Sequence, residues 1–240
     1  MSEYEIKGVL FDKNGTLINF DKTWFPIYNT VASEMAKGDM EKVIPMLSAI
    51  GIDYDDEICT AGSLSTIGDA FMIMQVWGDI LGDNNHYEME QYFNSRASQL
   101  LPETLVEITN TRNVFEQLKD MDIAVGIATC SSTAVLDASL DTMELGDDNE
   151  IFKCAYDSGY GQKPERGMVD GFADFNHIDN DQVMVVGDNL SDMAMALNAD
   201  AGACVGVLSG NGNTDDLVDA NCIVDTIDDI AELIEQEYSI

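Results

Sequence analysis

Four short segments of the 240-residue chain hold the side chains best suited to chemistry. They are Asp12-Lys13-Asn14-Gly15-Thr16, Thr129-Cys130-Ser131-Ser132, Gly161-Gln162-Lys163-Pro164 and Gly187-Asp188-Asn189-Leu190-Ser191-Asp192. Two or three carboxylates can hold a hard dication, and Mg²⁺ is the first expectation. A lysine, hydroxyls and turn amides can bind the oxygens of a phosphate. These residue types therefore predict a site for a phosphoryl group.

Short apolar runs, each closed by polar or turn residues, recur along the chain. They are Ile6 to Phe11, Ile123 to Ala128, Val183 to Val186 and Ala203 to Val207. Runs of this kind suit strands buried on both faces, and the intervening stretches place apolar residues at helical spacing. The alternation predicts a doubly wound parallel α/β sheet. Because such sheets place their sites at the carboxyl ends of the strands, we expect the four segments to converge on one rim.

Residues 20–102 break this alternation. The region is rich in Met, Trp and Tyr and predicts several helices, such as Trp24 to Lys37, Ser65 to Leu81 and Glu88 to Leu101. A structureless loop of this length would be unusual in a compact protein. We therefore expect a catalytic core of residues 1–19 and 103–240, with residues 20–102 as an inserted α-helical cap.

The charge of the chain is strongly negative. There are 45 Asp and Glu residues against 11 Lys and Arg, a formal net charge of -34, and the acidic residues occur all along the chain. A field of this sign repels nucleic acid and anionic lipid, so we expect neither as a partner. The charge is typical of halophilic adaptation to a salt-rich cytoplasm, where ions screen the self-repulsion.

Five scattered cysteines, without a CxxC pair, fit reduced thiols better than a disulfide framework. The acidic N-terminal stretch runs directly into a predicted strand, so it does not resemble a signal peptide. No apolar run reaches membrane-spanning length. We expect a soluble cytoplasmic protein whose partner is a small phosphorylated metabolite, and a homodimer is left open.

Taken singly, each candidate residue has a simpler explanation. Asp12 and Thr129 could be turn or helix-cap residues, and Lys163 could be a solvated loop lysine. Asp188 and Asp192, four residues apart, could simply favour a helix N-terminus. The functional interpretation depends on all four segments occurring together.

In order and spacing, the four segments resemble the signature motifs of the haloacid dehalogenase superfamily, and the resemblance covers essentially the whole chain. The phosphoglycolate-phosphatase-like branch, which has a helical cap, is similar in the stretches FDKNGTLINF, YDSGYGQKPERGMV, VGDNLSDM and VGVLSG. The resemblance implies a Rossmann-like core with a helical cap after the first motif. It also implies Mg²⁺-dependent hydrolysis of a small phosphate monoester, with phosphoglycolate as the named example.

The resemblance also implies roles for individual residues. Asp12 would be the nucleophile that takes the phosphoryl group as an aspartyl-phosphate. Thr129 would hydrogen-bond the phosphoryl oxygens, and Lys163 would neutralise the nucleophile and the phosphate. Asp12, Asp188 and the backbone carbonyl of Asn14 would bind Mg²⁺, with Asp192 supporting the metal.

Four further residues are expected to contact the substrate. Gly15, Thr16 and Cys130 would lie beside the phosphate. Arg96 is the sole arginine of the predicted cap and could meet a substrate carboxylate. A solvent-facing salt bridge is the alternative for Arg96.

Asn14 departs from the family pattern. The family's phosphatases normally have Asp two residues after the nucleophile, where it protonates the leaving oxygen and then deprotonates water. An amide cannot exchange a proton usefully near neutral pH, so we expect a loss of about 10²–10⁴-fold. Three explanations fit: a deliberate Asp→Asn change, a natural variant with weak or different chemistry, and a pseudo-enzyme that binds phosphate compounds. A phosphomutase, which shares the first half-reaction, is the rival activity.

Other signals are set aside. Cys130 lacks the arginine six residues later that a cysteine phosphatase needs, because Leu136 stands there. The glycines of residues 206–212 lack the GxGxxG spacing of a nucleotide loop. Trp24 and Trp77 are assigned to packing within the cap.

Overall fold

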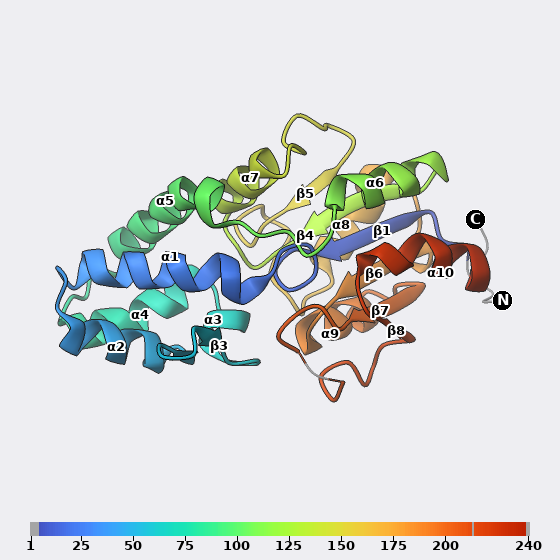
Figure 1. Ribbon diagram of the computed structural model, residues 1–240. Coiled ribbons are helices and arrows are strands. Elements are labelled where there is room, and N and C mark those ends of the chain that lie inside the picture. Colours follow the sequence, from blue (N-terminus) through green and yellow to red (C-terminus); the bar gives the residue numbers. More distant parts are fainter. Residues whose placement is uncertain (1–4, 213, 239–240) are drawn as a thin grey trace.

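The central element of the fold is a six-stranded parallel sheet. The computed structural model describes residues 5–212 and 214–238 (Figure 1). The strands lie in the order β5-β4-β1-β6-β7-β8. They are β1 (Gly8–Asp12), β4 (Ala124–Ala128), β5 (Phe152–Cys154), β6 (Val183–Gly187), β7 (Ala203–Val207) and β8 (Cys222–Val224). Every residue of β1, β6 and β7 is buried, as in a sheet covered on both faces. The predicted doubly wound α/β fold is confirmed.

Helices cover both faces of this sheet. Val9 and Phe11 of β1 pack into one apolar cluster with α6 (Thr111–Asp120) and α10 (Ile230–Glu237). Leu10, which points the other way because strand side chains alternate, packs with α8 (Gly167–Asn176) and α9 (Leu190–Asn198). Two short 3₁₀ helices, η1 (Asn180–Gln182) and η2 (Ile227–Asp229), lead into β6 and α10. Because helices pack on both faces, the sheet is rigidly held and the positions of its strand ends are fixed.

A group of helices lies between β1 and β4 in the chain and beyond the carboxyl ends of the strands in space (Figure 1). They are α1 (Phe20–Met35), α2 (Met40–Ala49), α3 (Leu64–Ile67), α4 (Ala70–Leu81) and α5 (His86–Thr104), with a small hairpin of β2 (Ile52–Asp53) and β3 (Ile58–Cys59). We call α1 to α5 the cap helices. They enclose an apolar cluster of their own, in which the rings of Tyr28 and Phe93 stack at 5.6 Å. The division of the chain at residues 20 and 102 stays a prediction.

Helix α7 (Thr133–Thr142) links the cap helices to the sheet. Its Val135 belongs to the apolar cluster of the cap helices, whereas Leu136 and Leu140 belong to a cluster on the sheet. The loop that precedes α7 carries Thr129 to Ser132. The second predicted segment therefore lies at the junction between sheet and cap helices.

The local differences from the sequence interpretation have simple causes. The stretch predicted as one helix from Ser65 to Leu81 is broken into α3 and α4, because Gly68 and Asp69 are extended and the Asp69 side chain caps α4. Helix α2, the β2–β3 hairpin and strands β5 and β8 were not anticipated. The strands among these have only two or three residues, too few for a periodic pattern. None of the helices in the described ranges is both long and apolar enough to cross a membrane.

Candidate functional site

The site lies where three neighbouring strands end. Strand β1 is hydrogen-bonded to β4 on one side and to β6 on the other. Because the three are parallel, their carboxyl ends meet at one edge of the sheet, at the point where the strand order reverses. Asp12 ends β1, Thr129 follows β4 and Asp188 follows β6. The fold thus brings residues from three separate segments together.

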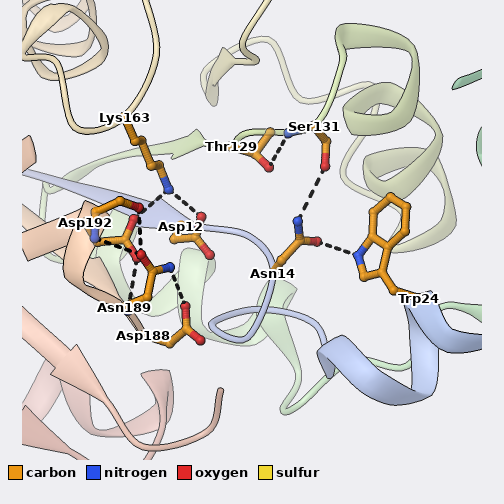
Figure 2. Close-up of polar contacts among 10 residues, drawn as sticks. Asp12, Asn14, Trp24, Thr129, Ser131, Lys163, Asp188, Asn189 and Asp192 are labelled. Atoms are coloured by element: carbon orange, nitrogen blue, oxygen red, sulfur yellow. Dashed lines mark hydrogen bonds and ion pairs between the residues drawn. The ribbon is translucent and has the colours of Figure 1, made fainter. Parts of the chain in front are cut away.

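Lys163 connects two of the carboxylates. Its Nζ forms ion pairs with Oδ1 of Asp12 and, at 2.6 Å, with Oδ1 of Asp192 (Figure 2). All three side chains are almost fully buried, between 0% and 7% exposed. Burial alone would lower the pKa of the Lys163 ammonium, but Asp12 and Asp192 together raise that pKa above its usual range. Lys163 therefore remains charged, and it fixes one oxygen of Asp12.

The other oxygen of Asp12 is in an unusual state. Oδ2 is buried and has no hydrogen-bond partner within residues 5–212 and 214–238. A buried carboxylate oxygen without a donor is costly, so such an atom calls for an explanation. A bound cation or a reacting phosphorus atom would supply one.

Asp188 is held by the loops around it. Its Oδ1 accepts a hydrogen bond from Nδ2 of Asn189 at 3.0 Å, and its Oδ2 accepts one from the backbone N–H of Asn211 at 3.1 Å. Gly15 has a positive φ of +85°, and a Cβ there would lie 2.3 Å from Asp188 Oδ2. A Cβ on Gly210 would lie 1.9 Å from the same oxygen. Glycine is required at both positions because backbone passes directly against the carboxylate.

Asp192 lies in the first turn of α9, where a capping box orients it. The backbone N–H of Asn189 donates to Oδ2 of Asp192 at 3.3 Å, and the Asn189 side chain accepts from the backbone N–H of Ser191. A Cβ on Gly187 would lie 2.3 Å from the Asp192 carboxylate carbon. Both oxygens of Asp192 are thus engaged, one by the cap and one by Lys163.

The three carboxylates fit a divalent cation. Asp12, Asp188 and Asp192 each place one oxygen so that the three lie within 4.8 Å of one another. Burial, reinforced by the neighbouring carboxylates, raises the pKa of Asp188 to about 8. Burial also raises the pKa of Asp192, to about 6, against the opposing effect of Lys163. A cation such as Mg²⁺ would reverse both shifts, since it favours the ionised carboxylates.

The segment after β4 provides small polar groups. Thr129 is buried, and its Oγ1 accepts a hydrogen bond from the backbone N–H of Ser131 at 3.1 Å. That arrangement leaves the hydroxyl hydrogen of Thr129 available for another acceptor. The Cys130 thiol is held neutral, because burial raises its pKa to about 11. Thr16 is buried, and its Oγ1 has no hydrogen-bond partner in the described part of the chain.

Asn14 points away from the carboxylates, towards the cap helices (Figure 2). Its Oδ1 accepts a hydrogen bond from Nε1 of Trp24 at 2.9 Å, and its Nδ2 donates to Oγ of Ser131 at 3.4 Å. The assignment of Trp24 to packing was incomplete, because its ring is buried in the cap cluster while its N–H faces the site. Nothing in the sequence beyond its place in the first helix after the motif marks this role.

Lys13 was given no role from the sequence. The structure buries it completely, with Nζ 3.3 Å from Oγ of Ser139 and 5.4 Å from the centre of the Trp24 ring. Burial lowers the pKa of Lys13 to about 7. Lys13 therefore faces the ring of the same Trp24 whose N–H donates to Asn14.

Two adjoining cavities open beside Asn14. A small one of about 40 Å³ lies between the cap helices and the loop after β4, and a larger one of about 470 Å³ extends towards α9. Asn14, Phe20 and Thr66 line both. Cys130 lines the small cavity and Lys163 the large one. These cavities provide the space for a substrate next to the carboxylates.

Arg96 is not brought to the site. Its guanidinium forms an ion pair with Glu34 of α1 at 2.7 Å and also donates to Gln99. It lines neither of the two cavities. The structure therefore favours the salt-bridge alternative for Arg96, because Glu34 on the facing helix binds it.

Comparison with known proteins agrees with this geometry. The family model for haloacid dehalogenase-like hydrolase matches residues 9–205. A hydrolase from Pseudomonas syringae shares the fold, with a TM-score of 0.69, 18% identity, and coverage of 98% of this chain and 100% of its own. A predicted phosphoglycolate phosphatase from Haemophilus somnus has a TM-score of 0.66 and 18% identity, and the match covers 97% of this chain and 99% of that protein. A β-phosphoglucomutase from Clostridium difficile has a TM-score of 0.66 and 15% identity, and the match covers 97% of each chain.

At such identities these structural likenesses show the fold alone. A search of curated protein sequences found no significant match. The family match covers most of the chain and includes all four segments of the site. The chain therefore belongs to the haloacid dehalogenase-like hydrolase family.

Proposed function

We propose that this hydrolase cleaves a small phosphate monoester by transferring the phosphoryl group first to Asp12 and then to water. The observation that carries the proposal is the state of the Asp12 carboxylate. Lys163 fixes its Oδ1, while its Oδ2 is buried next to Asp188 and Asp192 and has no hydrogen-bond partner among the residues that the structure describes. An oriented carboxylate with one unused oxygen is what a nucleophile for phosphoryl transfer requires.

Mg²⁺ is the proposed cofactor, in agreement with the family resemblance. Asp12, Asp188 and the main-chain carbonyl of Asn14 would hold it, and Asp192 would support it by orienting Lys163 and the α9 N-terminus. Bound there, Mg²⁺ supplies positive charge that offsets the charge of the carboxylates and of the phosphoryl oxygens.

In the first half-reaction Asp12 Oδ2 forms a bond to phosphorus while the ester P–O bond breaks. The product on the protein is an aspartyl-phosphate, and the leaving oxygen becomes an alcohol by taking a proton from solvent water. Lys163 holds the attacking carboxylate in one orientation and neutralises part of the added charge. The Thr129 hydroxyl would donate to a phosphoryl oxygen, since its oxygen already accepts from Ser131. Positioning and charge are the main sources of catalysis for such a transfer.

Each half-reaction also requires a proton transfer, and Asn14 cannot carry out either transfer. The leaving oxygen must gain a proton, and the water that attacks the aspartyl-phosphate must lose one. The Asn14 amide, held by Trp24 and Ser131, can donate a hydrogen bond but can do neither. We therefore propose that this chain turns over alkyl phosphates about 10²–10⁴-fold more slowly than it would with a carboxyl at this position.

The cap helices are proposed to close the cavities, exclude water and select the substrate. A phosphomutase would need a cation for the second phosphate of its bisphosphate intermediate. Lys163 is the one cationic side chain among the described residues that line the two cavities, and Asp12 and Asp192 already bind it. No observation therefore favours the phosphomutase over the phosphatase.

Mg²⁺-dependent phosphate release from a panel of monoesters, including p-nitrophenyl phosphate, tests the proposal. The chain is compared with Asn14→Asp and with Asp12→Asn, in high salt because of its net charge of -34. We expect Asn14→Asp to raise turnover by roughly 10²-fold or more, and Asp12→Asn to abolish it. If neither the chain nor Asn14→Asp turns over any ester while phosphate still binds, the protein is a phosphate-binding protein and the proposal is wrong.

A further inference from the structure

We infer that the organic group of the substrate carries hydroxyl groups and no charge. This inference rests on the proposed function and identifies the substrate class of the same site. It follows from the position of every cation in a chain that has only 11 Lys and Arg residues, all of which lie in the part that the structure describes.

Two of these cations lie near the site, and neither is available to a substrate's organic group. Lys163 is bound by Asp12 and Asp192, and the proposed function assigns it to the transferred phosphoryl group. Lys13 is completely buried, with its Nζ against Ser139 and the ring of Trp24. Lys13 lines neither cavity.

The other nine cations lie away from the cavities. Four are in ion pairs outside the cap helices: Lys7 with Glu5, Arg112 with Glu144, Lys119 with Asp148 and Arg166 with Asp170. Lys153 donates to the backbone carbonyl of Gly146. In the cap helices and the loop after α1, Lys22, Lys37 and Lys42 are exposed, and Arg96 pairs with Glu34. None of the nine lines either cavity.

The small cavity is lined instead by aromatic rings and neutral polar groups. Phe20, Trp24 and Phe93 contribute ring surface. Asn94 and Tyr156 contribute an amide and a hydroxyl, which are joined by a hydrogen bond of 3.4 Å from Asn94 Nδ2 and leave the Asn94 carbonyl oxygen as an acceptor for a substrate hydroxyl. Ring faces pack well against C–H groups, and amides and hydroxyls pair with hydroxyl groups. This combination suits a sugar or polyol better than a carboxylate.

Negatively charged side chains near this cavity also disfavour an anionic organic group. Glu90 accepts a hydrogen bond from the Tyr156 hydroxyl at 2.5 Å, and Asp69 accepts one from Gln162 at 3.4 Å. Neither carboxylate lines either cavity, but Glu90 lies directly behind the cavity-lining Tyr156, and no Lys or Arg in the described part of the chain lines the small cavity to offset an anionic leaving group. Phosphoglycolate, the example named from the family resemblance, is therefore expected to be a poor substrate.

Matched pairs of esters test the inference. 2-Hydroxyethyl phosphate and phosphoglycolate differ only in a CH₂OH group against a carboxylate, and glucose 1-phosphate and glucose 1,6-bisphosphate differ by a second phosphate. With Mg²⁺ and high salt, we expect kcat/KM of the Asn14→Asp protein to favour the neutral member by about 10²-fold or more. Equal values, or a preference for the anionic member, would overturn the inference and leave the phosphatase proposal intact.

Binding to the unaltered chain provides a readout that does not depend on turnover. In calorimetric titrations with Mg²⁺ present, we expect 2-hydroxyethyl phosphate to bind more tightly than phosphoglycolate. If no ester is turned over by any form, the proposed function fails, and the order of these two affinities still decides the inference. Tighter binding of phosphoglycolate would contradict it.

A single added cation should change the preference. Asn94→Lys places an ammonium in the lining of the small cavity, whereas Asn84→Lys adds the same charge at an exposed loop position. In the Asn14→Asp background we expect Asn94→Lys to raise kcat/KM for phosphoglycolate relative to 2-hydroxyethyl phosphate by about 10-fold or more. Asn84→Lys should leave the ratio unchanged. An equal effect of both variants, or no effect of Asn94→Lys, would show that the cavity does not determine the charge preference.

Discussion

The indole N–H of Trp24 donates a hydrogen bond to Oδ1 of Asn14 at 2.9 Å, and this contact joins the first cap helix to the loop of the nucleophile. The other end of the Asn14 amide reaches Oγ of Ser131 at 3.4 Å. A carboxyl group at position 14 could keep both contacts, since it would accept from the indole N–H and from the Ser131 hydroxyl. The surroundings therefore accommodate the family's usual acid as well as the amide.

The first prediction concerns the positioning role of Trp24. In the Asn14→Asp background, Trp24→Phe removes the N–H that orients the new carboxyl group. We expect kcat to fall by about 10-fold or more with little change in KM, because the acid is misplaced relative to the leaving oxygen. Steady-state kinetics with an alkyl phosphate measures both constants.

Trp77→Phe is the matched control for this prediction. Its Nε1 donates to the backbone carbonyl of Met46 inside the cap cluster at 2.8 Å, so the same chemical change occurs away from the site. We expect Trp77→Phe to lower thermal stability and to leave kcat within a few-fold. Equal losses of kcat in the two variants would show that Trp24 acts only through stability.

The second prediction concerns which step Asn14 impairs. p-Nitrophenolate leaves without protonation, so Asp12 should still attack p-nitrophenyl phosphate in the unaltered chain. Hydrolysis of the aspartyl-phosphate still lacks its base and should be slower by about 10²–10⁴-fold than in Asn14→Asp. Rapid mixing should therefore show a burst of about one p-nitrophenolate per site, followed by slow turnover, and intact-mass analysis should find one added phosphoryl group.

Two variants check the origin of this burst. Asp12→Asn should abolish both the burst and the mass increase, because it removes the nucleophile. Asn14→Asp should restore fast steady-state turnover, so that no separate burst phase is observed. A linear time course in the unaltered chain, with no phosphorylated protein, would show that the first transfer is also blocked.

The sequence predicted the sheet and the convergence of its polar segments because each segment directly follows an apolar run. Asp12, Thr129 and Asp188 are placed by the ends of β1, β4 and β6, and strand ends can be located from the pattern alone. What could not be predicted depends on contacts between distant parts of the chain. Arg96 was a candidate for a carboxylate ligand until the packing of α5 on α1 showed that Glu34 binds it.

Glycines show the same limit. Gly210 was set aside because its spacing does not match a nucleotide loop, yet no side chain would fit between its backbone and Asp188. Asn211 likewise holds Asp188 through its backbone N–H, a contact open to any residue except proline. Residue type carries little information where the backbone makes the contact. Only the folded chain reveals such residues.

The third prediction concerns the buried carboxylates. In metal-free protein, Asp188→Asn should raise the melting temperature, because burial and two neighbouring carboxylates disfavour ionisation of Asp188 in the folded chain, and an amide avoids that cost. The unaltered chain should gain stability when Mg²⁺ is added, by about 2.7 kcal/mol at a concentration 100 times its Kd. Asp188→Asn should gain much less, because a proposed ligand is lost.

Thermal unfolding with EDTA and with increasing Mg²⁺ measures both effects. Asp137→Asn, which removes an exposed carboxylate of α7, is the control for the change in net charge. It should respond to Mg²⁺ as the unaltered chain does. An equal Mg²⁺ response in Asp188→Asn would show that Asp188 does not bind the metal.

The fourth prediction concerns Lys13, whose ammonium is buried against Ser139 Oγ and the Trp24 ring. Lys13→Met keeps a long side chain and removes the charge, and Ser139 retains its hydrogen bond to the backbone carbonyl of Val135. Replacing a poorly compensated buried charge by an apolar group should raise the free energy of unfolding by roughly 1–4 kcal/mol at pH 7. Denaturant unfolding of metal-free protein measures this difference, with the exposed Lys42→Met as control.

The pH dependence of this difference has a definite sign. Burial lowers the pKa of Lys13 to about 7 from its ordinary 10.5, so between these values the unfolded chain binds a proton that the folded chain does not. The contribution of Lys13 to stability therefore improves as the pH rises through this window. The advantage of Lys13→Met should be greatest at pH 7 and below, and it should shrink as the pH approaches 10.5. A difference that is independent of pH would show that Lys13 is charged in the folded protein throughout this range, and that its ammonium is better compensated than its contacts indicate.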